Sequence, residues 1–145
     1  MTTYNAPVLD SGLGIPAQSS DVIGARPQPL FLSDDPDTLT QSLPVAASQT
    51  IAAGAVVGVD ANGRIVPATW NATPASRIDV IGVAAEALTT DASTNYKGLL
   101  VYVSGHFNSA RLTWDASFTT QAQKDTVLLK VLGRIKVGTI KTYTP

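Results

Sequence analysis

The stretch GAVVGVDANGRIVPA, at residues 54–68, decides the fold class of this chain. Two runs rich in valine and isoleucine flank Asp60, Asn62 and Gly63, which accept turn conformations that most other residues resist. Because β-branched side chains favour strands, the stretch predicts a β-hairpin. Short β-branched runs separated by turn residues continue toward the C-terminus, a pattern typical of a mainly antiparallel β domain.

The segments that follow the hairpin predict further strands. RIDVIGVAAEAL, at residues 77–88, is continuously apolar enough for a central strand. The polar run TTDASTNYK at 89–97 predicts a loop, and GLLVYVS at 98–104 predicts the strand that comes after it. His106 is then expected at the exit of this strand.

One short helix and a last strand are predicted near the C-terminus. In FTTQAQKDTVLLKVLG, at residues 118–133, apolar residues recur at helix-like spacing. Thr120 and Gln123 have the spacing of a capping box, and Gly133 fits the end of a helix. RIKVGTIKTY, at 134–143, loses its alternation at a glycine, which predicts a bulged edge strand.

The first 47 residues have a different character from the rest. They hold six of the nine prolines, and each proline fixes a backbone angle and removes a hydrogen-bond donor. They also carry five aspartates against one arginine. We therefore predict an extended, proline-rich N-terminal arm over residues 1–47 and a compact antiparallel β domain with one short helix, an α+β arrangement that is mainly β, over residues 48–145.

Composition excludes several classes of partner. The 145 residues are 44% apolar, enough for one core, and the net charge of −1 gives no overall attraction to nucleic acid or to an anionic membrane. The longest apolar stretch, at residues 51–59, is far shorter than the roughly 20 residues that span a bilayer. The N-terminus lacks the basic and apolar regions of a signal peptide, so we expect synthesis in the cytoplasm.

The sequence offers little chemistry. Ser104, His106 and Asp115 are the nearest approach to a hydrolytic triad, but no G-x-S-x-G motif accompanies them. With one histidine and no cysteine, a metal site would need carboxylates, and DDPD at residues 34–37 lacks the glycine and final glutamate of a calcium loop. We predict no catalytic residue, metal or cofactor, and a solvated turn at DDPD.

Two tryptophans leave an alternative open. Trp70 and Trp114 could stack sugars, as in a β-rich carbohydrate-binding module. Both follow apolar runs that resemble strands, and the sequence shows no polar partners beside them. Packing in a core or at a subunit interface is therefore the favoured interpretation.

The order of three segments resembles a known family. GRIVPATWN, then IDVIGVAAEAL, then LLVYVSGHFNSARLTW are similar in order and spacing to the head decoration proteins of lambda-like tailed bacteriophages. The resemblance covers residues 51–135. Its most specific part is a motif in which an aromatic residue precedes Ser-Gly, one further residue and phenylalanine, with a tryptophan downstream. These residues are Tyr102, Ser104, Gly105, Phe107 and Trp114. The resemblance implies that the aromatic residues of the motif pack in the core or in the trimer.

The resemblance implies a structural virion protein without enzyme activity. It implies a homotrimer on the outer surface of the expanded phage head, at three-fold and quasi-three-fold positions, where it bridges and stabilises neighbouring major capsid proteins. In this family the N-terminal arm orders on the capsid and adds a strand to it. The long arm and the C-terminal VGTIKTYTP depart from the family pattern.

The arm should bind the capsid through apolar side chains. Ordering a residue costs about 1–2 kcal/mol, whereas a backbone hydrogen bond returns only about 0.5–1.5 kcal/mol, so strand addition alone hardly gains free energy. We therefore expect residues 1–46 to be disordered in the free protein and dispensable for the trimer. The side chains expected to enter capsid grooves are Leu30, Phe31, Leu32, Leu43 and Val45.

Overall fold

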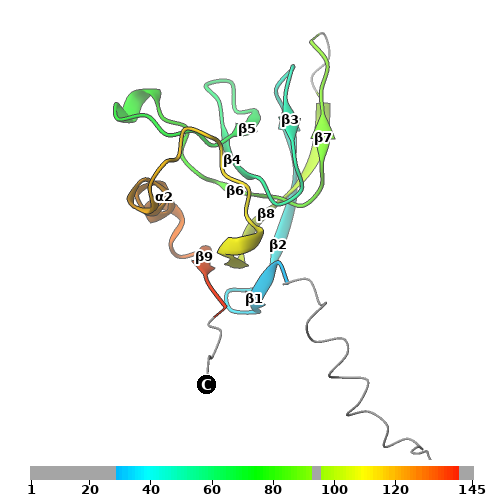
Figure 1. Cartoon of the computed structure of the whole chain (residues 1–145). Coiled ribbons are helices and arrows are strands. Elements are labelled where there is room, and N and C mark those ends of the chain that lie inside the picture. Colours follow the sequence, from blue (N-terminus) through cyan, green and yellow to red (C-terminus); the bar gives the residue numbers. More distant parts are fainter. Residues whose placement is uncertain (1–28, 93–95, 141–145) are drawn as a thin grey trace, which may run out of the picture.

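The computed structural model of the chain describes residues 29–92 and 96–140 (Figure 1). Within them the strands are β1 Phe31–Ser33, β2 Leu39–Val45, β3 Thr50–Ile51, β4 Val56–Val59, β5 Ile65–Pro67, β6 Gly82–Ala84, β7 Leu88–Thr89, β8 Tyr96–Asn108 and β9 Ile135–Gly138. The helix α2 spans Gln121–Leu128, and short 3₁₀ helices are η2 Pro74–Ser76, η3 Ser109–Arg111 and η4 Leu129–Val131. The described part is mainly β with one short α-helix, which confirms the predicted fold class.

Five strands close into a small barrel. The long strand β8 pairs antiparallel with β2 and with β6, β6 pairs with β4, and β4 pairs with β5. A parallel bridge between Val45 of β2 and Ile65 of β5 completes the circuit. Strands β3 and β7 form a separate antiparallel ribbon. We call the circuit of β2, β5, β4, β6 and β8 the barrel.

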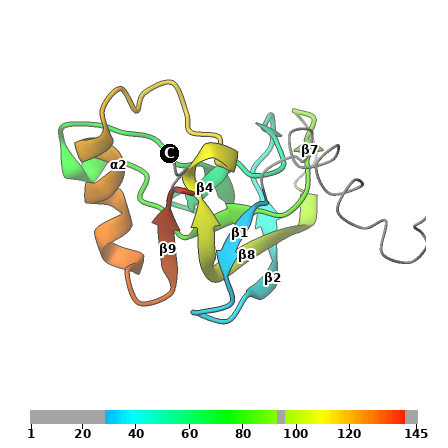
Figure 2. The ribbon, with the colours of Figure 1, turned by 60° about the horizontal axis from the view of Figure 1, so that its bottom comes forward.

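The far end of β8 lies outside the barrel and carries two more strands. Strand β1 pairs antiparallel with β8 at Phe107, and β9 pairs parallel with it, from Gly105 opposite Ile135 to Asn108 opposite Gly138. Figure 2 shows β1, β8 and β9 side by side in that order, with α2 beyond β9. The predicted antiparallel domain therefore contains two parallel pairings.

Strands β4 and β6 of the barrel are buried on both faces. Val57 belongs to one cluster, together with Val45, Ile65, Leu99 and Val101, whereas its neighbour Val56 belongs to a second cluster. We call the second cluster, which joins the sheet to α2, the helix core; its members are Val56, Ala68, Val80, Val83, Phe107, Phe118, Val127, Leu128, Val131 and Ile135. Successive side chains of a strand point to opposite faces, so two cores explain why the runs are continuously apolar.

The hairpin forms as the sequence predicts. Strands β4 and β5 pair antiparallel, with Val59 opposite Ile65. The Asp60 carboxylate accepts hydrogen bonds from the amides of Asn62 (2.8 Å) and Arg64 (2.9 Å), and Gly63 has φ of +75°. Glycine takes this conformation without steric penalty, which is why the turn is stable here.

The helix begins as predicted and ends earlier. The Thr120 hydroxyl accepts from the Gln123 amide while the Gln123 side chain accepts from the Thr120 amide, so the capping box is confirmed. The α-helix ends at Leu128, continues as η4 to Val131, and turns into β9. Gly133 lies in this turn and does not cap the α-helix directly. The predicted edge strand is β9 over Ile135–Gly138, and residues 141–143 lie outside the described residues.

Two strand boundaries differ from the prediction. Of residues 77–88, the central strand takes up Gly82–Ala84, while Ile78 makes an isolated bridge to Thr69. Strand β8 runs on to Asn108, so the prediction that His106 follows the strand is wrong. Near Ser104 the strands that pair with β8 change from β2 to β1 and β9. Because its backbone remains hydrogen-bonded, β8 continues past this point.

The predicted arm contributes two strands to the folded body. Residues 1–28 lie outside the described residues, but β1 and β2 both lie within the first 47. Strand β2 pairs with β8 along its length, and Val45 has no exposed surface. The ladder shifts register between Leu43 and Val45, at Pro44, which has no amide hydrogen to donate. The proline thus marks an irregularity in a strand, and the division at residue 47 cuts through the barrel.

Candidate functional site

The residues of the candidate triad are engaged separately. The Nδ1 atom of His106 is hydrogen-bonded to the Ser33 hydroxyl at 2.9 Å. Ser104 is buried in β8, and the Asp115 carboxylate accepts from the Ser117 amide at 2.9 Å. Among residues 29–92 and 96–140, no three histidine, cysteine or acidic side chains gather in a way that could hold a metal ion.

The Ser-Gly-x-Phe motif organises an aromatic cluster. Gly105 has φ of +152°, and a Cβ atom there would lie 3.2 Å from the rings of both Phe107 and Phe31. The ring of Phe31 lies 5.0 Å from Tyr102 and 5.1 Å from Phe107. The glycine therefore leaves room for a ring from β1 to pack on β8, and the motif serves the fold.

The five predicted anchor side chains contact the protein's own body. Leu30 and Phe31 pack against the helix core. Leu43 packs against the other cluster, which contains Val57, and Val45 is fully buried in that cluster. Leu32 is half-buried, and its Cδ1 atom lies near Gly138 of β9. In this fold Val45 has no surface to offer a capsid groove, because its strand is part of the barrel.

This internal role was hidden from the sequence. The segment LTQSLPV contains few β-branched residues and a proline, so its pairing with β8 could be found only from the partner strand. The acidic turn that precedes it is exposed, as expected, and Asp35 is 88% exposed. Its carboxylate accepts from Lys136 of β9 at 3.2 Å, which adds a polar contact between the turn and the far side of β8.

The two tryptophans pack around Phe118. The Phe118 ring lies 4.9 Å from Trp114 and 6.5 Å from Trp70, and all three belong to the helix core or pack against it. The guanidinium of Arg77 lies 4.7 Å above Trp70, and the ammonium of Lys124 lies 5.4 Å above Trp114. Stacking a sugar on either of these ring faces would first require the cation to move. The arrangement favours packing over sugar binding.

Tyr102 and Phe107 also have packing roles. Phe107 is fully buried in the helix core, and Tyr102 is half-buried against it. The structure of one chain accounts for all four aromatic residues as core or near-core residues. Their contact with a second subunit remains a prediction.

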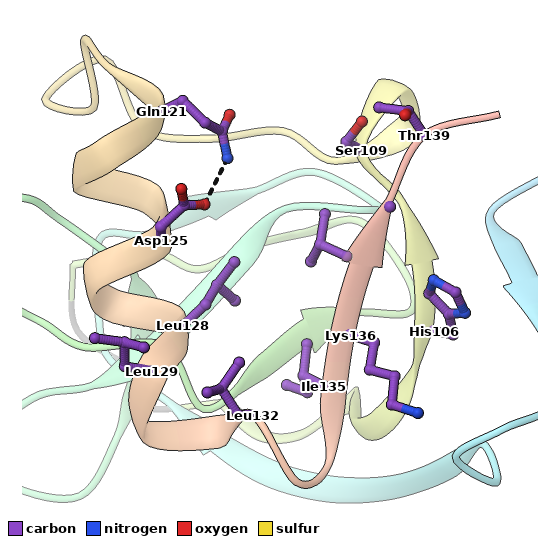
Figure 3. Close-up of a pocket in the computed structure, with 12 residues that line it drawn as sticks. His106, Ser109, Gln121, Asp125, Leu128, Leu129, Leu132, Ile135, Lys136 and Thr139 are labelled. Carbon is purple, nitrogen blue, oxygen red and sulfur yellow. Dashed lines mark hydrogen bonds between the residues drawn. The ribbon is translucent and has the colours of Figure 1, made fainter. Parts of the chain in front are cut away.

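An apolar groove separates α2 from β9 (Figure 3). We call it the α2–β9 groove; it has a volume of about 630 Å³. Leu128 and Leu132 point into it from the helical side and Ile135 from β9, as Figure 3 shows. At its mouth Gln121 donates a hydrogen bond to Asp125 at 2.8 Å. Leu129 and Leu132 also line it and are 62% and 57% exposed, so this groove presents apolar surface to solvent.

Together these features define a small β-rich structural domain, in which packing accounts for the most specific motif and for the aromatic residues. A family model described as bacteriophage lambda head decoration protein D matches residues 23–143. The chain therefore belongs to the bacteriophage lambda head decoration protein D family, as the resemblance indicated. It is a structural component of a phage head and is located on the virion capsid.

Two further findings accompany this match. A comparison with curated proteins gave no match. Within the described residues, no helix has the length and apolar character needed to cross a membrane.

Proposed function

We propose that this protein is a homotrimeric cement of the phage head. It binds the outer surface of the expanded head at three-fold and quasi-three-fold positions and stabilises the shell by bridging neighbouring major capsid proteins. It has no enzyme activity and is made in the host cytoplasm. The observation that carries the proposal is the family match over residues 23–143, which includes both cores and every described strand.

The surface of the domain supports a role in assembly. Six large apolar side chains are substantially exposed: Leu39, Val59, Leu100, Leu129, Leu132 and Ile140. Burying a large apolar side chain contributes about 1.5–3 kcal/mol, so several of them at one interface can offset the cost of association. Contacts with other subunits and with capsid proteins would cover this surface.

The capsid-binding arm is better assigned to the residues before β1. The structure engages Val45, Leu43 and Phe31 in the chain's own cores, which leaves them little surface for the capsid. Residues 1–28 also contain apolar residues. We therefore assign the capsid contact to this shorter segment.

The experiment measures mass and attachment together. Light scattering of the purified full chain should give a mass near three chains, and the protein should co-sediment with expanded, undecorated heads. Decorated heads should then withstand heating better than bare heads. A monomer at micromolar concentration that fails to bind heads would contradict the proposal, whereas saturable glycan binding lost in Trp70→Ala and Trp114→Ala would favour a carbohydrate-binding module.

A further inference from the structure

Strand β9 has one free edge, and this edge faces the α2–β9 groove. On its other side β9 pairs with β8, where the Gly105 amide donates to the carbonyl of Arg134 at 2.8 Å. Peptide groups alternate in direction along a strand, so those of Ile135 and Val137 point away from β8. No strand within residues 29–92 or 96–140 pairs with this edge.

The groove beside this edge is mostly apolar, with Asp125 and Lys136 also in its lining, and it is large enough for a short peptide. Leu128 and Ile135 form buried parts of its wall, and the exposed Leu129 and Leu132 form its rim. Its volume of about 630 Å³ lies within the roughly 300–1,000 Å³ typical of ligand sites. An unpaired strand edge next to apolar pockets is the arrangement that binds an extended segment by strand addition.

The described structure begins beside the C-terminal end of β8. The Pro29 carbonyl accepts from the side-chain amide of Asn108 at 3.0 Å, and the Asn108 backbone amide donates to the Leu30 carbonyl at 2.8 Å. Asn108 is fully buried and lies opposite Gly138, which lines the groove together with Ser109. Pro29 therefore lies beside the C-terminal end of β8, level with the C-terminal end of β9.

We propose that residues 20–23 of the same chain occupy the α2–β9 groove as an added strand that runs parallel to β9. From β1 to a strand added at the free edge of β9 is three strand spacings of about 4.8 Å each, roughly 14 Å. The five residues 24–28 span roughly 16 Å when extended, at about 3.3 Å each, so they suffice for the crossing. Successive side chains of a strand point to opposite faces, so one of Val22 and Ile23 faces the apolar wall of the groove and the other points the opposite way.

The direction of the added strand follows from where the chain must end. Residue 29 contacts Asn108, which lies opposite Gly138 at the C-terminal end of β9, so a segment that reaches it from the groove runs the same way as β9. A five-residue linker gives a high effective concentration at the groove, about millimolar, which favours this occupant over a separate molecule. The family match begins at Ile23 and therefore includes the linker. The inference does not depend on the capsid role.

A spin label tests the proposal, because the chain has no cysteine and a single one can be introduced. Leu129→Cys places a nitroxide on the groove rim, and Val59→Cys places a control label beside the hairpin turn, which Figure 1 shows at the opposite end of the domain. In NMR spectra of the free full-length protein, the amide signals of Val22 and Ile23 should lose most of their intensity with the first label and little with the second. Equal intensity with both labels overturns the proposal.

Mixed samples identify the source of the segment. Isotope-labelled chain without cysteine is mixed with a large excess of unlabelled chain that carries the Leu129→Cys nitroxide. If Val22 and Ile23 lose as much intensity there as in the singly labelled sample, a second copy fills the groove and the same-chain proposal is wrong. Little loss in the mixture supports it.

Amide exchange gives an independent measurement. In the full chain, Ile23→Asp should accelerate hydrogen exchange at Ile135 and Val137 by about tenfold or more, since their amides lose a partner. Ile15→Asp is the matched control and should leave both rates unchanged. Fast exchange at both amides already in the unmodified protein would mean that the edge is unpaired, which contradicts the proposal.

Discussion

The ring of Phe31 meets the ring of Tyr102 edge to face, with centroids 5.0 Å apart and planes at 89°. One residue belongs to β1, near the N-terminal end of the described structure, and the other to the middle of β8. Such a pair contributes about 0.5–1.5 kcal/mol beyond the burial of its area. The contact therefore holds β1, which the sequence predicted to be part of an extended arm, against the folded domain.

Phe31→Ala should therefore destabilise the domain. A fully buried phenylalanine costs about 3–5 kcal/mol when truncated, and because Phe31 is half-buried we expect roughly 2 kcal/mol. Denaturant unfolding measures the loss, and Leu39→Ala, at a side chain 57% exposed in β2, is the control with little effect. If Phe31→Ala weakens attachment to heads and leaves unfolding unchanged, the side chain is a capsid anchor after all.

Gly105→Ala should destabilise the domain through backbone strain and crowding. An alanine at φ of +152° is strained, and its Cβ would press on two rings at 3.2 Å. We expect a loss of about 1–3 kcal/mol in the free energy of unfolding. Gly133→Ala is the matched control, because nothing lies within 4 Å of its added Cβ. A similar loss in both variants would contradict this explanation of the motif.

Two deletions should separate the arm from the barrel. Removing residues 1–46 takes away β1 and β2, including the fully buried Val45, so the remaining chain should not fold cooperatively. Removing residues 1–19 leaves the described structure and the proposed groove segment intact. This variant should keep the melting temperature and the trimer mass and bind heads more weakly, as thermal melts, light scattering and co-sedimentation can measure. Tight head binding by this variant would show that residues 1–19 are a passive tail.

His106→Ala should have a small effect. It removes one hydrogen bond to Ser33, and a hydrogen bond of this kind contributes about 0.5–1.5 kcal/mol net. Ser33→Ala removes the same bond and should cause a similar shift in unfolding, while head attachment stays nearly unchanged in both variants. Abolished attachment in His106→Ala alone would assign this histidine a role that its contacts do not indicate.

Local patterns let the sequence predict much of the domain. The hairpin turn depends on Asp60 and Gly63, and the start of α2 depends on Thr120 and Gln123, residues that interact within four positions of one another. The continuously apolar run around Val56 likewise signals burial on both faces. Such features follow from neighbouring residues, so they need no knowledge of the distant chain.

The remaining features of the fold depend on contacts between residues that are far apart in the sequence. The sequence by itself determined a mainly β domain with one helix and the family to which it belongs. Only the tertiary structure placed Val45 in the barrel, His106 inside β8 and the free edge of β9 beside α2. A strand as polar as LTQSL gains its stability from backbone hydrogen bonds to β8 and from the cluster that Val45 joins, and both partners lie far away in the sequence.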